Sequence, residues 1–156
     1  MQMKYGIGTE SRHNLDSKKR IFVPARIRDL LGRELVITCD MSRGRACLGI
    51  YSVEGWDQHV ERALELCESE EERQDTVDEL CFGLIAAELD DQGRVTLTKQ
   101  LIEYAELEKE VVVTGSGDHA LIWNAAIYDE MRSGINHLDS LKAILGRKRP
   151  GSADRS

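Results

Sequence analysis

The chain has 156 residues, of which 41% are hydrophobic, 5% aromatic and 31% charged, and its formal net charge is −7. This length suits one domain of ordinary size with a largely aliphatic core. No apolar run approaches the roughly 20 residues that a membrane-spanning helix needs, and residues 1–10 lack the apolar stretch of a secretion signal. We therefore expect a cytoplasmic protein with no membrane partner.

The cysteines and histidines have no spacing typical of a metal site. Cys39, Cys47, Cys67 and Cys81 include no Cys-x-x-Cys pair, and the four histidines share no ligand spacing. We expect reduced, mostly buried thiols, no metal and no cofactor.

Residues 1–52 are predicted to form a first unit: strand, tight turn, strand, short helix, strand, strand. Within it, residues 1–33 hold eight basic and three acidic residues, a net charge of +5. The strand RIFV runs into Pro24, which suits the first position of a helix, and Gly32 stands where a left-handed C-terminal cap belongs. The helix between them is under three turns long, so it has to pack on the strands to be stable.

Residues 53–82 are predicted to form an acidic helical hairpin. Residues 54–80 hold eleven acidic residues against Arg62 and Arg73, a net charge of −9. Ser69 can cap the second helix, and Glu72 then completes a capping box. The acidic face is interpreted as a solvated surface, and it could also dock a protein partner.

Residues 83–124 are predicted to repeat the first unit. Two segments align at a shift of 74 residues: LDSKKRIFVPARIRDLL (15–31) with LDDQGRVTLTKQLIEYA (89–105). With two extra residues in the second copy, ELVIT (34–38) then aligns with EVVVT (110–114). Asp90 and Gly93 stand at the first and fourth positions of a predicted type I turn.

Residues 125–146 are predicted to form one C-terminal helix, because apolar residues recur at helical spacing from Ile127 to Leu145. Residues 147–156 are polar and basic and are predicted to be a disordered tail.

The fold class that these elements predict is α+β. A unit of about 40 residues with four short strands buries too little surface to be stable alone. We therefore expect the two copies to pack through a pseudo-twofold axis around one shared core.

The motifs do not predict an enzyme. Asp90 and Asp91 are adjacent carboxylates, but neighbours on a strand or turn point in different directions. The sequence has no Gly-x-Ser-x-Gly, no His-Glu-x-x-His and no phosphate-binding loop.

The basic turn of the first unit favours DNA binding. Lys18 and Lys19 lie in this turn and Arg20 follows it, with Arg12 on the preceding strand and Arg26 and Arg28 on the following helix. A β-hairpin fits the major groove of DNA, where arginine reads guanine and lysine neutralises phosphate. We also expect Lys19 to occupy a turn position with positive φ, where a lysine is strained.

The spacing Asp-x-x-x-Arg occurs in both copies, as Asp16 with Arg20 and as Asp90 with Arg94. One interpretation is an ion pair that braces each turn, the other is a DNA contact by Arg20, and the two are compatible. Residues 86–114 carry a net charge of −4, so DNA contact is expected through the first copy only.

The chain resembles the MraZ family, the bacterial regulators encoded at the head of the division and cell-wall gene cluster. The resemblance lies in LDSKKRIFVPARIRDLL, FGLIAAELDDQGR and YAELEKEVVVTGSGDHALIW, and it covers about residues 3–132. The chain departs from the family pattern where Lys19 replaces the usual glycine, and at Thr96, Thr98 and Ile102, where an apolar residue, a proline and an arginine are usual.

The resemblance implies two SpoVT/AbrB-type repeats of ββαββ type that form a swapped-hairpin-like β-barrel. It also implies a nucleoid-associated, ring-like homo-oligomer that binds short direct repeats in its own promoter and usually represses transcription. Arg20 would be the main residue that contacts double-stranded DNA, with Asp16 shaping the turn and Lys18 and Lys19 beside it. The alternative is an antitoxin-like or scaffold module that uses the same fold to bind a protein partner.

Overall fold

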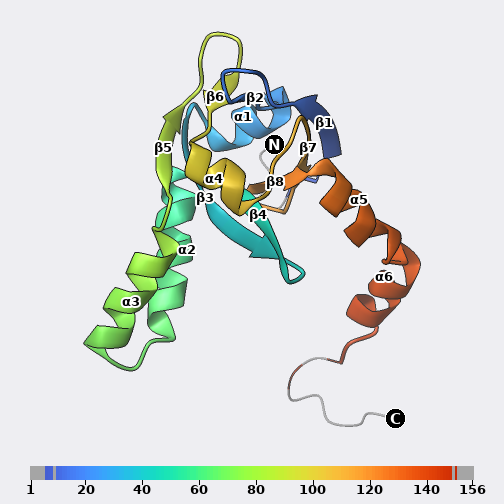
Figure 1. Cartoon of the computed structure of the whole chain (residues 1–156). Helices are drawn as coiled ribbons and strands as arrows, with labels where there is room; N and C mark the ends of the chain where they lie inside the picture. Colours follow the sequence, from blue (N-terminus) through green and yellow to red (C-terminus); the bar gives the residue numbers. More distant parts are fainter. Residues whose placement is uncertain (1–5, 9, 149, 151–156) are drawn as a thin grey trace. The chain divides into compact units, whose positions relative to one another are not determined.

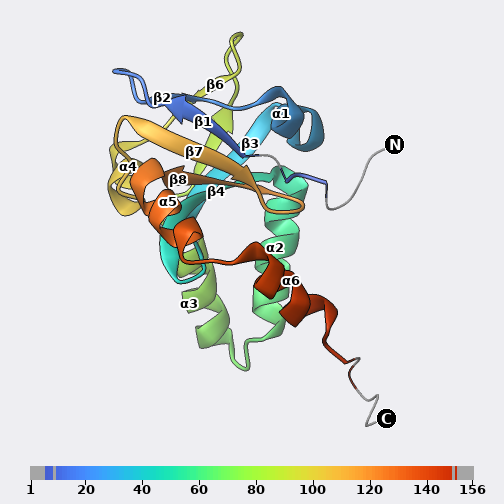
Figure 2. The same cartoon turned by 90° about the vertical axis from the view of Figure 1, so that its right-hand side faces the viewer.

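The computed structural model describes residues 6–8, 10–148 and 150. The chain divides into two compact units, Met1–Ala125 and Ala126–Ser156. The first unit contains an antiparallel sheet in the order β1-β7-β8-β4-β3-β5 and a two-stranded ribbon, β2–β6 (Figures 1 and 2). Among the described residues the fold is therefore α+β, as predicted.

The elements follow the repeat that was predicted from the sequence. The strands are β1 (Glu10–Asn14), β2 (Arg20–Phe22), β3 (Glu34–Ser42), β4 (Arg45–Ser52), β5 (Ile85–Glu88), β6 (Arg94–Thr96), β7 (Glu110–Gly115) and β8 (Ala120–Asn124). The helices are α1 (Ala25–Leu31), α2 (Val53–Glu65), α3 (Glu70–Leu80), α4 (Lys99–Tyr104), α5 (Ala125–Ser133) and α6 (His137–Leu145).

The strand registers carry a pseudo-twofold axis. In the ribbon, Ile21 pairs with Val95, the residue 74 positions further along that occupies the same place in the second copy. Leu35 pairs with Ser52 in the first copy and its counterpart Val111 pairs with Asn124 in the second, so β4 and β8 correspond at a shift of 72 residues. By this shift Gly49 corresponds to Leu121, and the two pair with each other. Two counterparts that pair with each other lie on opposite sides of the axis, so the axis passes between the members of both pairs.

The two copies exchange their first strands. β1 of the first copy pairs with β7 of the second, with His13 opposite Val111. β5 of the second copy pairs with β3 of the first, with Ala87 opposite Leu35. This exchange matches the swapped arrangement that the resemblance implies.

Closure of the predicted β-barrel is not confirmed. Within the described residues, β1 and β5 are the outer strands of the six-stranded sheet, and the ribbon pairs only with itself. The strands β2 and β6 are three residues each, so few backbone groups are available to bridge the ribbon to the edges of the sheet.

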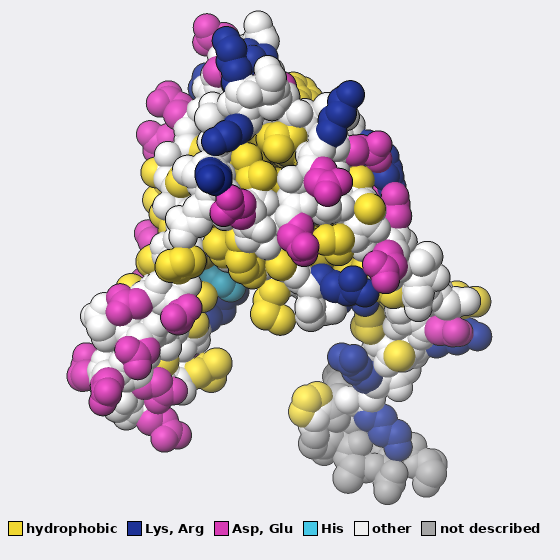
Figure 3. Space-filling view, in the orientation of Figure 1, with side chains coloured by type: hydrophobic (Ala, Val, Ile, Leu, Met, Phe, Trp, Pro, Cys, Tyr) yellow, Lys and Arg dark blue, Asp and Glu magenta, His cyan; other side chains and the backbone are white. Residues whose placement is uncertain are grey.

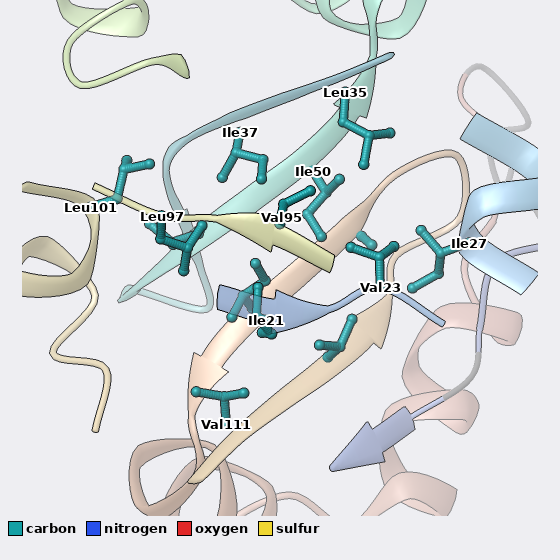
Figure 4. Close-up of a cluster of buried hydrophobic side chains, with 14 of the residues drawn as sticks. Ile21, Val23, Ile27, Leu35, Ile37, Ile50, Val95, Leu97, Leu101 and Val111 are labelled. Atoms are coloured by element: carbon teal, nitrogen blue, oxygen red, sulfur yellow. The ribbon is translucent and has the colours of Figure 1, made fainter. Parts of the chain in front are cut away.

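One aliphatic core joins the two copies. Ile21 and Val95 are each 1% exposed and lie between the ribbon and the sheet (Figure 4). Around them pack side chains of both copies that are at most 2% exposed: Val23, Ile27, Ile37, Ile50, Leu97, Leu101, Val111 and Ile122. Neither copy could bury these side chains alone.

The hairpin of α2 and α3 attaches to the sheet mainly through α2. Trp56 packs with Val36 and Tyr51 in a second cluster, and α3 has no buried residue. Ser69 caps α3 as predicted by accepting a hydrogen bond from Glu72 N (3.0 Å). The Glu72 carboxylate accepts from Glu68 N (3.0 Å), one residue before the position that a capping box uses.

The C-terminal part contains two helices where one was predicted. The predicted helix breaks between α5 and α6 because Gly134 interrupts it and Asn136 starts a new helix by accepting from Asp139 N (3.0 Å). Of the predicted tail, residues 147, 148 and 150 are described, and the rest lies outside the described residues.

Candidate nucleic-acid interface

The turn between β1 and β2 is braced by one carboxylate. Asp16 Oδ1 accepts from Lys18 N (2.9 Å) and Arg20 N (2.8 Å), while Oδ2 accepts from Arg20 Nε (2.7 Å). The backbone hydrogen bond from Arg20 is the largest cause that lowers the pKa of Asp16 below its usual value, and the ion pair with Arg20 adds to it. An ionised Asp16 therefore accepts the hydrogen bonds that close the turn and orients the guanidinium of Arg20.

The turn between β5 and β6 repeats this geometry. Asp90 Oδ1 accepts from Gln92 N (2.9 Å) and Arg94 N (2.8 Å), and Oδ2 accepts from Arg94 Nε (3.0 Å). The pKa of Asp90 is lowered, first of all by the backbone hydrogen bond from Arg94. The bracing interpretation thus accounts for the spacing Asp-x-x-x-Arg in both copies.

The two arginines differ in how many carboxylates they face. Arg20 pairs with Asp16, whereas Arg94 pairs with Asp90 and also has Nη1 at 4.0 Å from Asp16 Oδ2. Their side chains are about equally exposed, 28% and 27%. A second carboxylate neutralises Arg94 more fully, so Arg20 keeps more of its positive charge for an anion.

The lysines of the first turn are available to a ligand. Lys18 and Lys19 are exposed, and neither forms an ion pair with a described carboxylate. Lys19 has φ of 62°, which confirms the expected strained position, and Gly93 has φ of 76° at the same place in the second turn. The first turn thus presents two free cations where the second presents Gln92 and Gly93.

The remaining basic residues of the sequence prediction are already engaged. Arg12 is exposed on β1, where it pairs with Glu110 (3.2 Å) and lies 3.6 Å from Glu10. Arg26, at the start of α1, donates from Nη2 to Gly6 O (3.1 Å). Both would have to exchange these partners to bind a phosphate.

Arg28, one of the basic residues of the first unit, lies beside the second turn, a position that the sequence did not predict. Arg28 of α1 lies over the ring of Phe22, with Cζ 5.4 Å from the ring centroid. Its Nε is buried and has no hydrogen-bond partner among the described residues. The alignment of the two copies offered a signal, because it places Arg28 opposite Ile102 and Phe22 opposite Thr96.

Charge is distributed unevenly over the first unit. The turns at 16–19 and 90–93 project from one end of the first unit, and the α2–α3 hairpin lies at its other end (Figures 1 and 2). Aspartate and glutamate side chains gather on that hairpin (Figure 3), in agreement with its net charge of −9. The basic turn therefore lies far from the strongest negative charge of the unit.

Neither a membrane-spanning helix nor a metal site is present within the described part of the chain. No helix there is long and apolar enough to cross a bilayer. No group of three or more histidine, cysteine or acidic side chains in the same residues could hold a metal ion. Of the four thiols, Cys47 is buried, which raises its pKa to about 12, whereas Cys81 is exposed, contrary to the expectation of mostly buried thiols.

Comparison with known proteins identifies the family. The sequence profile of the family described as "MraZ protein, putative antitoxin-like" matches residues 7–78 and 83–144. A transcriptional regulator MraZ of Dictyoglomus turgidum is 34% identical over 139 residues, which cover 86% of this chain and 90% of that protein. Transcriptional regulators MraZ of Moorella thermoacetica and Carboxydothermus hydrogenoformans are 36% and 33% identical, and the matches cover 78% and 80% of this chain and 82% and 85% of theirs.

Each of the two matched segments contains one of the two copies that the strand registers relate by a twofold axis, together with the helices that follow it. The resemblance stated from the motifs is thereby confirmed, and so is the prediction of a regulator rather than an enzyme. The chain belongs to the MraZ family of transcriptional regulators.

Proposed function

We propose that this chain is a sequence-specific DNA-binding regulator that acts as a repressor of the bacterial division and cell-wall gene cluster. It binds short direct repeats in its own promoter through the turn at residues 16–19, as a homo-oligomer associated with the nucleoid in the cytoplasm. The observation that carries this proposal is the pair of exposed, unpaired lysines beside an arginine whose guanidinium is oriented by Asp16.

The chemistry of this turn suits a groove of DNA. Arg20 is held by its Nε, so the two Nη groups can donate together to one acceptor pair, as arginine does to guanine. Lys18 and Lys19 precede Arg20 in the turn and can neutralise neighbouring phosphates. Asp16 thus belongs to the site as the residue that orients Arg20, while Asp90 and Arg94 brace the other turn.

One small turn gives weak, strongly salt-dependent binding. An assembly that presents several turns to repeated sites makes the later contacts intramolecular, which raises avidity by about 10² to 10⁴. Self-association and repeated operator sites therefore belong to one mechanism.

The experiment is fluorescence anisotropy with a labelled duplex from the region upstream of the gene, at two salt concentrations. Arg20→Ala and Arg94→Ala serve as a matched pair, because each removes the same brace. The proposal expects tight binding that weakens with salt, is lost in Arg20→Ala and is retained in Arg94→Ala. Binding no tighter than to a shuffled duplex would contradict it and favour the protein-partner alternative, which a pull-down with the folded chain would then examine.

A further inference from the structure

The two turns rest on different side chains, although the same twofold axis relates them. The turn at 90–93 lies against Phe22 and Arg28 of the other copy: a Cβ built on Gly93 would lie 3.0 Å from Arg28 Cζ and 3.2 Å from Phe22 Cε1. Arg28 also lies over the ring of Phe22, so both side chains lie close to Gly93 and to each other. We call Phe22 and Arg28 the clamp of the second turn.

Within the described part of the chain the first turn has no counterpart of this clamp. The shift of 74 residues places Thr96 where Phe22 lies and Ile102 where Arg28 lies. Threonine offers no ring for a cation, and Ile102 packs against the aliphatic core. The backbone contacts around the two turns are otherwise matched, since Leu97 N donates to Lys19 O and Val23 N donates to Gly93 O, both at 2.8 Å.

Backbone conformation adds an independent difference. Gly93 adopts its φ of 76° without strain because it has no Cβ. Lys19 has a φ of 62°, and its Cβ makes this conformation strained. The second turn is thus relaxed and clamped, while the first is strained and open.

We propose that Arg28 is a positioning residue that locks the 90–93 turn, and that the missing clamp leaves the 16–19 turn able to adjust to a DNA groove. Only the second part of this proposal, the adjustment of the 16–19 turn to DNA, rests on the proposed function. The two turns then have different roles: the 90–93 turn stabilises the fold, and the 16–19 turn adapts to DNA.

Native-state hydrogen exchange tests the structural half without DNA. The amides of Lys19 and Gly93 both donate 3.0 Å hydrogen bonds, to Asp16 O and Asp90 O, so their protection factors are directly comparable. The proposal expects stronger protection at Gly93. Arg28→Ile, which copies the residue of the second repeat, is expected to lower protection at Gly93 by about three- to tenfold and leave Lys19 unchanged.

Arg28→Lys keeps the charge but not the planar guanidinium, and the same loss at Gly93 is expected from it. Amides of β7 in the core report any global destabilisation, which would lower protection at both turns alike. Equal protection of the two turns in the wild type, or an equal effect of Arg28→Ile on both, would overturn the clamp.

The DNA half is tested by building a clamp under the first turn. The triple variant Lys19→Gly, Thr96→Phe, Ile102→Arg is compared with Lys19→Gly alone, so that the loss of the lysine is common to both. The triple variant is expected to raise protection at residue 19 and to bind the upstream duplex more weakly than Lys19→Gly. Equal affinity of the two variants would overturn the need for an adaptable turn, whereas absence of binding by the wild type would refute the proposed function and leave the exchange result standing.

Discussion

At residue 19 a lysine occupies a backbone conformation that favours glycine, and its counterpart Gly93 shows what the fold itself prefers. A non-glycine residue in the left-handed region destabilises the folded state by about 1 to 2 kcal/mol. Replacing it with glycine recovers only part of this stability, because glycine also makes the unfolded chain more flexible. The lysine is free of ion pairs within the described chain, so nothing seen in the fold compensates this strain. The proposed neutralisation of phosphate by Lys19 would account for the tolerance of this strain.

Lys19→Gly is therefore expected to stabilise the protein by about 0.5 to 1 kcal/mol and to weaken DNA binding. Urea unfolding measures the first effect and anisotropy the second. Gly93→Lys is the matched reverse change, and it should destabilise the fold because its Cβ meets the Arg28–Phe22 contact. A more stable Lys19→Gly variant with unchanged affinity would separate the strain from the function.

The carboxylates of the two braces predict a specific dependence of stability on pH. The folded state lowers the pKa of both Asp16 and Asp90, so it favours their ionised forms. The stability they contribute is complete above about pH 4, the usual range of an aspartate, and is lost as the pH falls through their lowered folded values.

The double variant Asp16→Asn, Asp90→Asn should accordingly lose less stability between pH 7 and acid than the wild type does. Urea unfolding midpoints at several pH values measure this. Asp91→Asn changes a carboxylate of the same turn that takes no part in the brace, and it should keep the wild-type dependence. A wild-type profile in the double variant would contradict the bracing role.

At the scale of elements, the α2–α3 hairpin is held by an aromatic cluster that also contains titratable groups. Tyr51 donates to Asp40 Oδ2 (2.7 Å) and stacks on His119, with ring centroids 4.7 Å apart. His59 of α2 lies 5.2 Å from the ring of Tyr51 and 5.6 Å from that of Trp56. The attachment of α2 thus depends on a histidine that packs as a neutral ring.

Burial is the largest cause that lowers the pKa of His59, with Arg62 and His119 acting in the same direction and Asp40 and Asp118 opposing it. The folded state therefore favours the neutral form. The stability contributed by His59 is complete above its usual pKa of about 6.5 and is lost as the pH falls through the lowered folded value.

The protection factors of the α2 backbone amides, corrected for intrinsic exchange rates, should fall a few-fold when the pH is lowered from 7.5 to 5.5. His59→Phe keeps a ring and removes the proton, so this change should largely disappear. His13 of β1, whose pKa burial also lowers, provides the control: His13→Phe should leave the behaviour of α2 unchanged. An unchanged pH dependence in His59→Phe would contradict this account.

Over the whole molecule, local chemistry predicted much of the structure. Pro24 and Gly32 bound the short helix: Pro24 is its N-cap, one residue before the predicted first position, and Gly32 has the expected positive φ, 88°. The break before α6 was missed because apolar spacing continues across Gly134. Local sequence patterns also do not predict which strands pair with each other. The exchange of β1 and β5 between the copies was therefore implied only by the resemblance.

The candidate site was predictable to a similar depth. Turn, brace and basic residues follow from the spacing of Asp16, Lys18, Lys19 and Arg20. The proposed role of Arg28 depends on contact with Gly93 of the other copy, and in the sequence its only signal is the mismatch with Ile102. The pseudo-twofold axis therefore creates two sites of similar shape, and side-chain charge makes them unequal.

The most direct test of this inequality exchanges the turns within one fold. Ser17→Asp, Lys18→Gln and Lys19→Gly together give the first turn the sequence of the second, and Asp91→Ser, Gln92→Lys and Gly93→Lys do the reverse. Affinity for the upstream duplex is measured by anisotropy over a range of salt concentrations. We predict that the first variant folds at least as stably as the wild type, loses at least tenfold in affinity, a loss of about 1.4 kcal/mol, and has a shallower salt dependence. Wild-type affinity and salt dependence in that variant would contradict DNA contact through the first turn.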